Sequence, residues 1–137
     1  EMKHAFWGPS YDDKTILKSI NSKSLKFKKF SNTDELTNYA AKIIANDKVV
    51  GWYQGRSEWG SRALGNRSIL ANPVNKNMKD IINSKIKKRE SFRPFAPSVL
   101  EEDTNKFFEC DIRSEFMNHI IKFNCFEPIE KIKTKVF

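Results

Sequence analysis

Arginine and glycine are concentrated in one part of a chain that otherwise relies on lysine. The chain holds 19 lysines but six arginines, and five of the six lie between residues 56 and 93. They are Arg56, Arg62, Arg67, Arg89 and Arg93. The stretch GWYQGRSEWGSRALGNRSILANP, from Gly51 to Pro73, also contains four of the five glycines. Its β-rich start and its glycines predict a strand followed by a turn-rich loop.

These two residue types suit the binding of a compact polyanion. Arginine presents a planar fork that pairs with carboxylate or phosphate through two parallel hydrogen bonds. Glycine lets backbone N–H groups approach an anion closely. The stretch contains neither GxxxxGK[ST] nor a GxGxxG that opens a helix, so these two common phosphate sites are not predicted. The simpler alternative is that the arginines form surface ion pairs with Glu58 and Glu90 and that the glycines only mark turns.

Length and composition indicate a single packed domain. The chain has 137 residues, 39% of them hydrophobic and 12% aromatic, which suffices for one core but not for two ordinary enzyme domains. A formal net charge of +8 is compatible with nucleic-acid binding, but the excess of lysine indicates a general compositional bias. No apolar run is long enough for a membrane span and no signal peptide opens the chain, so a cytoplasmic location is expected.

Helices are predicted from capping residues and apolar spacing. Ser10 is expected to cap a first helix that includes Thr15 to Ile20. Asn32, with Glu35 three residues later, forms a capping-box pattern before a second helix whose apolar face extends to Ile44. A third helix is expected at NKNMKDIINSKIK and a short fourth one at TNKFFECD.

Strands are predicted between these helices. HAFWGP near the start is expected to be the end of a strand, SLKFKKF a short half-buried strand, and KVVGWYQG a β-rich run. RPFAPSVL is expected to form an edge strand because of its prolines, and EFMNHIIKF a final strand. This mixture predicts an α/β or α+β fold in which helices flank one mostly buried sheet.

Two long motifs carry a resemblance to a known family. GRSEWGSRALGNRSILANP, followed by MKDIINSKIKKRESFRPFAPSVL, resembles the C-terminal domain of the carbamoyltransferases that modify antibiotics, cephalosporins and nodulation factors. This is the NodU/CmcH and tobramycin O-carbamoyltransferase family. The likeness starts near HAFWGPSYDD and runs to about residue 123, so it covers most of the chain.

The resemblance implies a fold and a reaction. The fold would be YrdC-like, a twisted mixed sheet flanked by helices with a concave, positively charged face. The reaction would cleave carbamoyl phosphate and transfer its carbamoyl group onto AMP, with ATP as the nucleotide, to give carbamoyl-adenylate. A separate Kae1-like, actin-related domain, in the same or a partner chain, would then pass the group to an acceptor hydroxyl.

The resemblance also implies roles for individual residues. Arg56, Arg62 and Arg67 are expected to be catalytic. The residues expected to bind nucleotide and phosphate are Lys87, Arg89, Arg93, Ser68 and Asn66. The arginines and Lys87 would hold two phosphorylated reactants together and stabilise the charge that develops during transfer. Glu58 is expected to orient an arginine and to stay ionised with a lowered pKa. No metal-ligating residue is predicted, although Mg²⁺ is expected to accompany ATP.

The chain departs from the family pattern at four motif positions, which are Trp59, Ser61, Asn72 and Ser91. It also lacks the later HxDGTxRxQ-like motif, and it opens with Glu rather than Met. We therefore expect residues 1–137 to be the carbamoyltransferase C-terminal domain within a fragment of a longer chain, inactive on its own.

Two alternative functions remain open. One is a non-catalytic nucleotide- or RNA-binding module that keeps the basic concave face, whose sign would be RNA affinity that falls steeply with salt. The other is a structural remnant in which Trp52, Phe92 and Phe95 form the core and the arginines pair with acidic side chains.

Overall fold

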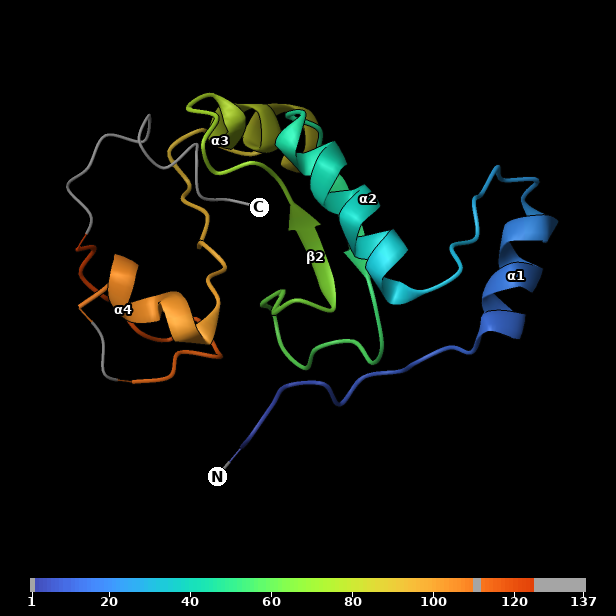
Figure 1. Cartoon of the computed structure of the whole chain (residues 1–137), viewed down its shortest axis with the longest axis horizontal. Helices are drawn as coiled ribbons and strands as arrows, with labels where there is room; N and C mark the ends of the chain where they lie inside the picture. Colours follow the sequence, from blue (N-terminus) through green and yellow to red (C-terminus); the bar gives the residue numbers. More distant parts are fainter. Residues whose placement is uncertain (1, 110–111, 125–137) are drawn as a thin grey trace. The chain divides into compact units, whose positions relative to one another are not determined.

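The structure is a computed structural model that describes residues 2–109 and 112–124. Its contacts divide the chain into two compact units, Glu1–Ala71 and Asn72–Phe137. The described elements are helices and a small antiparallel sheet, which confirms the mixed α/β class (Figure 1). The YrdC-like arrangement and the grouping of the whole chain into one domain stay predictions.

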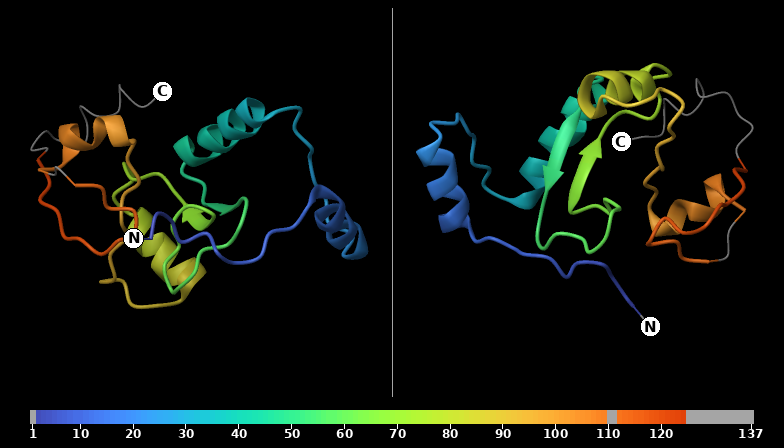
Figure 2. Two further views of the ribbon diagram at one scale, coloured as in Figure 1. Left: turned by 90° about the horizontal axis from the view of Figure 1, so that it is seen from below. Right: turned by 180° about the vertical axis from the view of Figure 1, so that it is seen from behind.

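The sheet of the first unit is a pair of antiparallel strands. β1 (Val50–Tyr53) pairs with β2 (Arg67–Leu70), with Gly51 opposite Ile69. The right-hand view of Figure 2 shows the two strands side by side and pointing in opposite directions. β1 lies within the predicted run KVVGWYQG, whereas β2 is not among the predicted strands. Four residues after a glycine-rich loop are too short a run to show the alternation that indicates a strand. They form a strand because they pair with β1.

The helix that packs on β1 is α2 (Thr33–Ala45) (Figure 1). Its N-cap Asn32 accepts the backbone N–H of Glu35 at 2.8 Å. The Glu35 carboxylate in turn accepts the backbone N–H of Ser31 at 3.0 Å, one residue before the usual partner in a capping box. The predicted cap is therefore confirmed, and Ala40 is the buried residue of this helix.

The first helix, α1 (Asp13–Ser22), is capped by Asp12. The Asp12 carboxylate accepts the backbone N–H of Thr15 at 2.9 Å. The prediction that Ser10 caps this helix is wrong, because Ser10 lies two residues before the position that can reach the first turn. α1 buries none of its residues.

The second unit begins with a helix that changes its pitch. α3 (Met78–Ile81) continues directly into η1 (Ile82–Lys87), a wider turn of π-helix. Both lie within the predicted helix NKNMKDIINSKIK, so that prediction is confirmed. η1 ends at Lys88, whose φ of 47° is left-handed. Turns of π-helix often occur at functional sites, so the residues that follow are of interest.

A short helical segment follows in the second unit. The 3₁₀ turn η2 (Glu101–Asp103) leads into α4 (Thr104–Phe107), which confirms the predicted short helix. The last two positions of that prediction, residues 110 and 111, lie outside the described residues. Phe108 and Phe123 then form an isolated antiparallel bridge, with 5.7 Å between their ring centres.

Besides HAFWGP, which forms no regular strand, three predicted strands are absent from the described structure. SLKFKKF forms no strand, and Leu25 and Phe27 are 57% and 55% exposed because no described strand pairs with them. RPFAPSVL is not a strand either, since Pro94 and Pro97 supply no backbone N–H for pairing. EFMNHIIKF contains a turn in which Met117 has a φ of 54°, and only its last residue joins a bridge.

Few hydrophobic side chains are enclosed in the described residues. The buried ones are Ala5, Ala40, Met78 and Ile82. Many larger side chains are exposed, including Phe92, which the structural-remnant hypothesis placed in a core. Across residues 2–109 and 112–124, no helix combines the length and the apolar character that crossing a membrane requires.

Candidate functional site

The residues predicted to bind phosphates fall into two groups, one in each unit. The first group lies in the loop of residues 54–66 and at the start of β2. It consists of Arg56, Glu58, Arg62, Asn66, Arg67 and Ser68. The second group lies at the end of η1 and in the segment after it. It consists of Lys87, Arg89 and Arg93.

Glu58 organises the loop between β1 and β2. Its Oε1 atom accepts three backbone N–H groups, from Leu64 and Asn66 at 2.8 Å and from Arg67 at 3.1 Å. Partial burial raises the pKa of Glu58, but these backbone hydrogen bonds outweigh it and hold the pKa below its usual value. The lowered pKa agrees with the prediction, although backbone amides cause it. The converging N–H groups are therefore occupied by a carboxylate of the chain itself.

Asn66 and Ser68 make hydrogen bonds inside the same loop. Asn66 is buried, and its amide donates to the carbonyl of Arg56 at 2.7 Å and accepts from the Gln54 side chain at 3.1 Å. The Ser68 hydroxyl accepts the backbone N–H of Gly65 at 3.0 Å. These contacts fix the two ends of the loop against each other.

The guanidinium group of Arg67 is hydrogen-bonded along its edge and lies against an aromatic ring with its face. Its Nη1 atom donates to the carbonyls of Gln54 at 2.7 Å and Asn66 at 2.9 Å. Its Nη2 atom donates to the carbonyl of Gly55 at 3.1 Å. The guanidinium carbon lies 3.4 Å from the centre of the Tyr53 ring. Most of the hydrogen-bonding capacity of Arg67 is therefore used within the protein.

Arg56 attaches the N-terminal segment to the loop. Its Nε atom donates to the carbonyl of Gly8 at 3.0 Å, and its Nη2 atom to that of Trp7 at 3.1 Å. The backbones add three bonds. The N–H of Gly8 donates to the carbonyl of Ser57 at 2.9 Å, that of Ser57 to the carbonyl of Pro9 at 3.1 Å, and that of Trp59 to the carbonyl of Ala5 at 2.5 Å. The predicted strand end HAFWGP is thus a backbone segment bonded to the loop without forming a regular strand.

Arg62 differs from these two arginines. It is exposed, and within the described residues its side chain has no hydrogen bond or ion pair. It lies between Gly60 and Gly65, whose φ values of 97° and 111° favour glycine. The loop thus turns at both glycines and carries a guanidinium group that no described residue neutralises.

Arg89 is the best anchored cation of the second group. Its Nε atom donates to the side-chain oxygen of Asn83 at 2.7 Å. Its guanidinium carbon lies 5.0 Å from the centre of the Phe95 ring, within the range of a cation–π contact. No described residue accepts from its two Nη atoms, so they remain able to donate to a ligand.

Arg93 and Lys87 are more exposed. The Nε atom of Arg93 donates to the carboxylate of Glu90 at 2.9 Å, a surface pair of the kind that contributes little stability. Lys87 is exposed, and its side chain has no hydrogen bond or ion pair in the described structure. The ion pair that the simpler alternative expected at Glu90 therefore exists, whereas Glu58 forms no ion pair with an arginine in the part of the chain that the structure describes.

Sequence reasoning missed the role of Asn83. This residue is completely buried, with an exposed fraction of 0%, and it bonds to the segment that carries Arg89 and Arg93. The sequence does contain a signal for it, because Asn83 is a polar residue between Ile82 and Ile86 in the apolar stripe of a predicted helix. A buried amide at such a position would be costly without hydrogen-bond partners.

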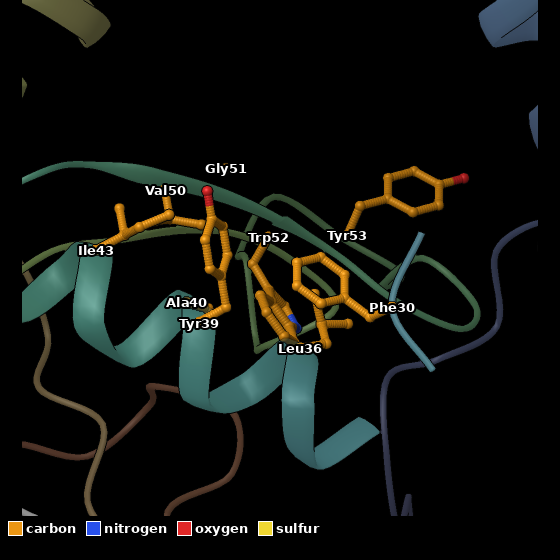
Figure 3. Close-up of a pocket in the computed structure, with 9 residues that line it drawn as sticks. All are labelled: Phe30, Leu36, Tyr39, Ala40, Ile43, Val50, Gly51, Trp52 and Tyr53. Carbon is orange, nitrogen blue, oxygen red and sulfur yellow. The ribbon is translucent and has the colours of Figure 1, made fainter. Parts of the chain in front are cut away.

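An apolar hollow of about 300 Å³ lies between α2 and β1 in the first unit. Figure 3 shows Tyr39 and Leu36 extending from the helix and Trp52 from the strand, with Phe30 beside them. The helical spacing predicted that this face packs on another element, and β1 covers part of it. The hollow has no cluster of charged groups, so it is not the predicted phosphate site.

The predicted cations retain different capacities for a ligand. Arg62 and Lys87 keep all their donors, Arg89 and Arg93 keep their Nη groups, and Arg67 keeps few. Within the described ranges, no three His, Cys, Asp or Glu side chains lie close enough together to hold a metal ion. Each of the two groups presents guanidinium donors that can bind an anion, and the second group adds the ammonium of Lys87.

Comparison with known proteins identifies the family. The family model described as "Carbamoyltransferase C-terminus" matches residues 41–133, which is more than half of the chain. "Nodulation protein NolNO" of Sinorhizobium fredii is 47% identical over 124 residues, which are 88% of this chain and 18% of that protein. "3'-hydroxymethylcephem-O-carbamoyltransferase" of Amycolatopsis lactamdurans is 46% identical over 74 residues, which are 54% of this chain and 14% of that protein.

A third relative is matched over nearly the same share of this chain as NolNO. "Nodulation protein NolO" of Bradyrhizobium diazoefficiens is 46% identical over 121 residues, which are 85% of this chain and 22% of that protein. The chain thus spans about a fifth of the length of the curated nodulation proteins that it matches over most of its own length.

Proposed function

This chain belongs to the carbamoyltransferase C-terminus family, and from that premise we propose that it is the nucleotide- and carbamoyl phosphate-binding domain of an O-carbamoyltransferase. The name of the cephem relative supports a hydroxyl oxygen as the type of acceptor in such enzymes. In this proposal a separate Kae1-like domain, in the same or a partner chain, binds the acceptor. The small share of its relatives that the chain spans is compatible with such a domain.

The proposed reaction has two steps. Water cleaves carbamoyl phosphate to carbamate and phosphate. A carbamate oxygen then attacks the α-phosphorus of ATP, pyrophosphate leaves, and carbamoyl-adenylate forms. Both reactants carry several negative charges, so bringing them together requires fixed cations that also stabilise the charge on the transferring groups. Mg²⁺ is expected to bind together with ATP.

The roles of the residues follow from the donors that they retain. In this proposal Arg62 of the first unit donates to phosphate oxygens. In the second unit Arg89 and Arg93 do so, and Lys87 adds a point charge there. Arg56 and Arg67 contribute positive charge while their hydrogen bonds to backbone carbonyls hold the loop. This division explains why the segment uses arginine both for ligand contact and for structure.

The observation that carries the proposal is the contrast between Glu58 and Arg62. The Glu58 carboxylate fixes the loop backbone through three N–H groups, while Arg62 in the same loop has no partner in the described residues. A cation on a preorganised loop needs little rearrangement when an anion arrives, which is the condition for strong electrostatic stabilisation.

Binding to the Arg62→Gln variant tests the proposal. The affinity of the chain for ATP and for carbamoyl phosphate is measured by isothermal titration calorimetry, each ligand separately. We expect the variant to lose at least one of the two affinities by a factor of about ten or more, because a charge-assisted bond is removed. Lys14→Gln in α1 is the matched control, since it removes one exposed charge outside both motifs.

Two results would contradict the proposal. One is an Arg62→Gln variant that binds both ligands as tightly as the parent. The other is an equal loss in the Lys14→Gln control, which would mean that net charge alone governs binding. Circular dichroism of each variant verifies that the fold is retained, which is expected because the exposed side chain of Arg62 has no hydrogen bond or ion pair in the described residues.

A further inference from the structure

Asn83 satisfies every polar group of its side chain by bonding to one short segment. Its Nδ2 atom donates to the carbonyls of Ser91 at 3.3 Å and Arg93 at 3.0 Å. Its Oδ1 atom accepts from Nε of Arg89 at 2.7 Å. A buried amide without partners would be costly, so these bonds determine where the segment can lie.

The backbone of Asn83 bonds to the same segment. Its carbonyl accepts the backbone N–H of Lys88 and, at 3.0 Å, that of Arg89. The left-handed φ of 47° at Lys88 turns the chain back over the end of η1. Residues 88–93, which we call the arginine loop, are thus attached at both ends to a single buried residue.

We propose that Asn83 is a positioning residue that holds the arginine loop in one conformation, so that Arg89 and Arg93 present their Nη groups together to a phosphorylated ligand. The ligand in this statement rests on the proposed function. The positioning itself rests on the hydrogen bonds from Asn83 to residues at both ends of the arginine loop.

The geometry of Arg89 explains why its anchoring matters. Asn83 binds the Nε side of the guanidinium group, and the Phe95 ring lies 5.0 Å from its carbon. The two Nη atoms form the remaining edge of the planar fork, and two parallel bonds from such an edge match the oxygens of a phosphate. A group fixed on one side and beside an aromatic ring loses little freedom when it binds.

Two substitutions at Asn83 separate its interactions. Asn83→Leu has a similar size and removes all side-chain hydrogen bonds to the arginine loop. Asn83→Asp keeps an acceptor for Arg89 but removes the donors to Ser91 and Arg93. The side chain of Asn105 in α4 is exposed and has no hydrogen bond in the described structure, so Asn105→Leu and Asn105→Asp are matched controls in the same unit.

Nuclear magnetic resonance of the ligand-free chain tests the positioning directly. In the parent, the Nε–H group of Arg89 should exchange with water more slowly than that of Arg62, which has no described partner. Asn83→Leu should remove this difference, and Asn83→Asp should keep it. Equal exchange at Arg89 and Arg62 in the parent would overturn the proposal, as would protection of Arg89 that persists in Asn83→Leu.

Ligand affinity tests the consequence for function. With ATP as the probe in calorimetry, Asn83→Leu should bind at least about tenfold more weakly than the parent, Asn83→Asp by a smaller factor, and the Asn105 variants unchanged. A purely structural role would lower the urea midpoint without changing the affinity of the folded protein, and that result would overturn the proposal.

The two tests also distinguish this proposal from the proposed function. If the parent binds neither ATP nor carbamoyl phosphate, the proposed function fails, while the exchange of the Arg89 Nε–H group still decides whether Asn83 fixes the arginine loop. If Asn83→Leu does not fold, Arg89→Lys replaces it, because lysine keeps the charge but lacks the Nε–H group that Asn83 binds. Arg89→Lys should then bind ATP about tenfold more weakly, and unchanged affinity would overturn the proposal.

Discussion

The guanidinium carbon of Arg67 lies 3.4 Å from the centre of the Tyr53 ring, and these two residues are direct partners in the β1–β2 pair. The aromatic face holds the cation from one side, while backbone carbonyls of the loop accept from its Nη atoms. This pair closes the base of the loop that carries Arg62. The hairpin and the candidate phosphate loop therefore depend on the same arginine.

Replacing Arg67 by lysine should destabilise the hairpin although the charge is kept. Lysine lacks the planar fork, so its single ammonium nitrogen cannot replace the two Nη atoms that bond to separate carbonyls, and it cannot stack flat on Tyr53. We expect a loss of about 2 to 3 kcal/mol in the free energy of unfolding, measured by urea denaturation. Arg113→Lys is the control, because Arg113 pairs with Glu101 on an exposed surface and should leave the midpoint nearly unchanged. Equal effects would contradict this account of Arg67.

The stability of the chain should depend on the ionisation of Glu58. Its pKa in the folded state is lowered, so the carboxylate stabilises the fold above the unfolded pKa of about 4.3, and this contribution is lost as the pH falls through the folded value. Glu58→Gln should therefore be less stable than the parent by about 1 to 3 kcal/mol near neutral pH, and the difference should shrink on acidification.

Urea denaturation of both proteins between about pH 7 and pH 3 measures this difference. Glu101→Gln is the matched control, because the carboxylate of Glu101 also has a lowered pKa but lies in an exposed pair with Arg113. A gap between parent and Glu58→Gln that stays constant with pH would show that the charge of Glu58 is not what holds the loop.

The two glycines Gly8 and Gly51 should respond in opposite ways to replacement by alanine. A Cβ atom at Gly8 would collide with the Ser57 side chain and lie 3.0 Å from the Ser57 carbonyl oxygen, whereas one at Gly51 would meet nothing within 4 Å. Gly8→Ala should cost about 1 to 3 kcal/mol because the N-terminal segment must move away from the loop. Gly51→Ala should be neutral or stabilising by up to about 1 kcal/mol. Thermal melting of both variants measures this difference. Equal melting temperatures would contradict the close approach of Gly8 to Ser57.

The helices could be predicted because their signals are local. The bond from Glu35 to Asn32 spans three residues, and the apolar stripe around Met78 repeats within one helix. The strands depended on partners elsewhere in the chain. The alternation around Phe27 resembled a strand, but no described segment pairs with it, while β2 became a strand through pairing with β1.

The residue types of the candidate site could be predicted from the sequence, but the contacts of each arginine could not. Clustered arginines and glycines marked the loop correctly, since Gly60 and Gly65 do take left-handed conformations there. The pattern could not tell which arginines bind the protein itself. The hydrogen bond from Arg56 to Gly8 joins residues 48 positions apart, and the sequence contains no spacing rule for such a contact.

The salt dependence of binding should separate a small phosphorylated ligand from a nucleic acid. Each phosphate neutralised on a nucleic acid releases counterions, so RNA bound along a basic face would lose about three or more orders of magnitude in affinity between about 50 and 200 mM salt. ATP held by a few guanidinium groups has few phosphates to neutralise, and its affinity should fall by about tenfold or less over the same range.

Calorimetry with ATP and fluorescence anisotropy with a single-stranded RNA measure the two salt slopes on the same protein. Arg62→Gln should weaken the binding of at least one of ATP and carbamoyl phosphate by about tenfold or more. The same variant should leave the salt slope of RNA binding nearly unchanged, because one charge among the 25 lysines and arginines matters little to a distributed surface. Tight RNA binding with a steep slope and no affinity for ATP would instead support the non-catalytic module.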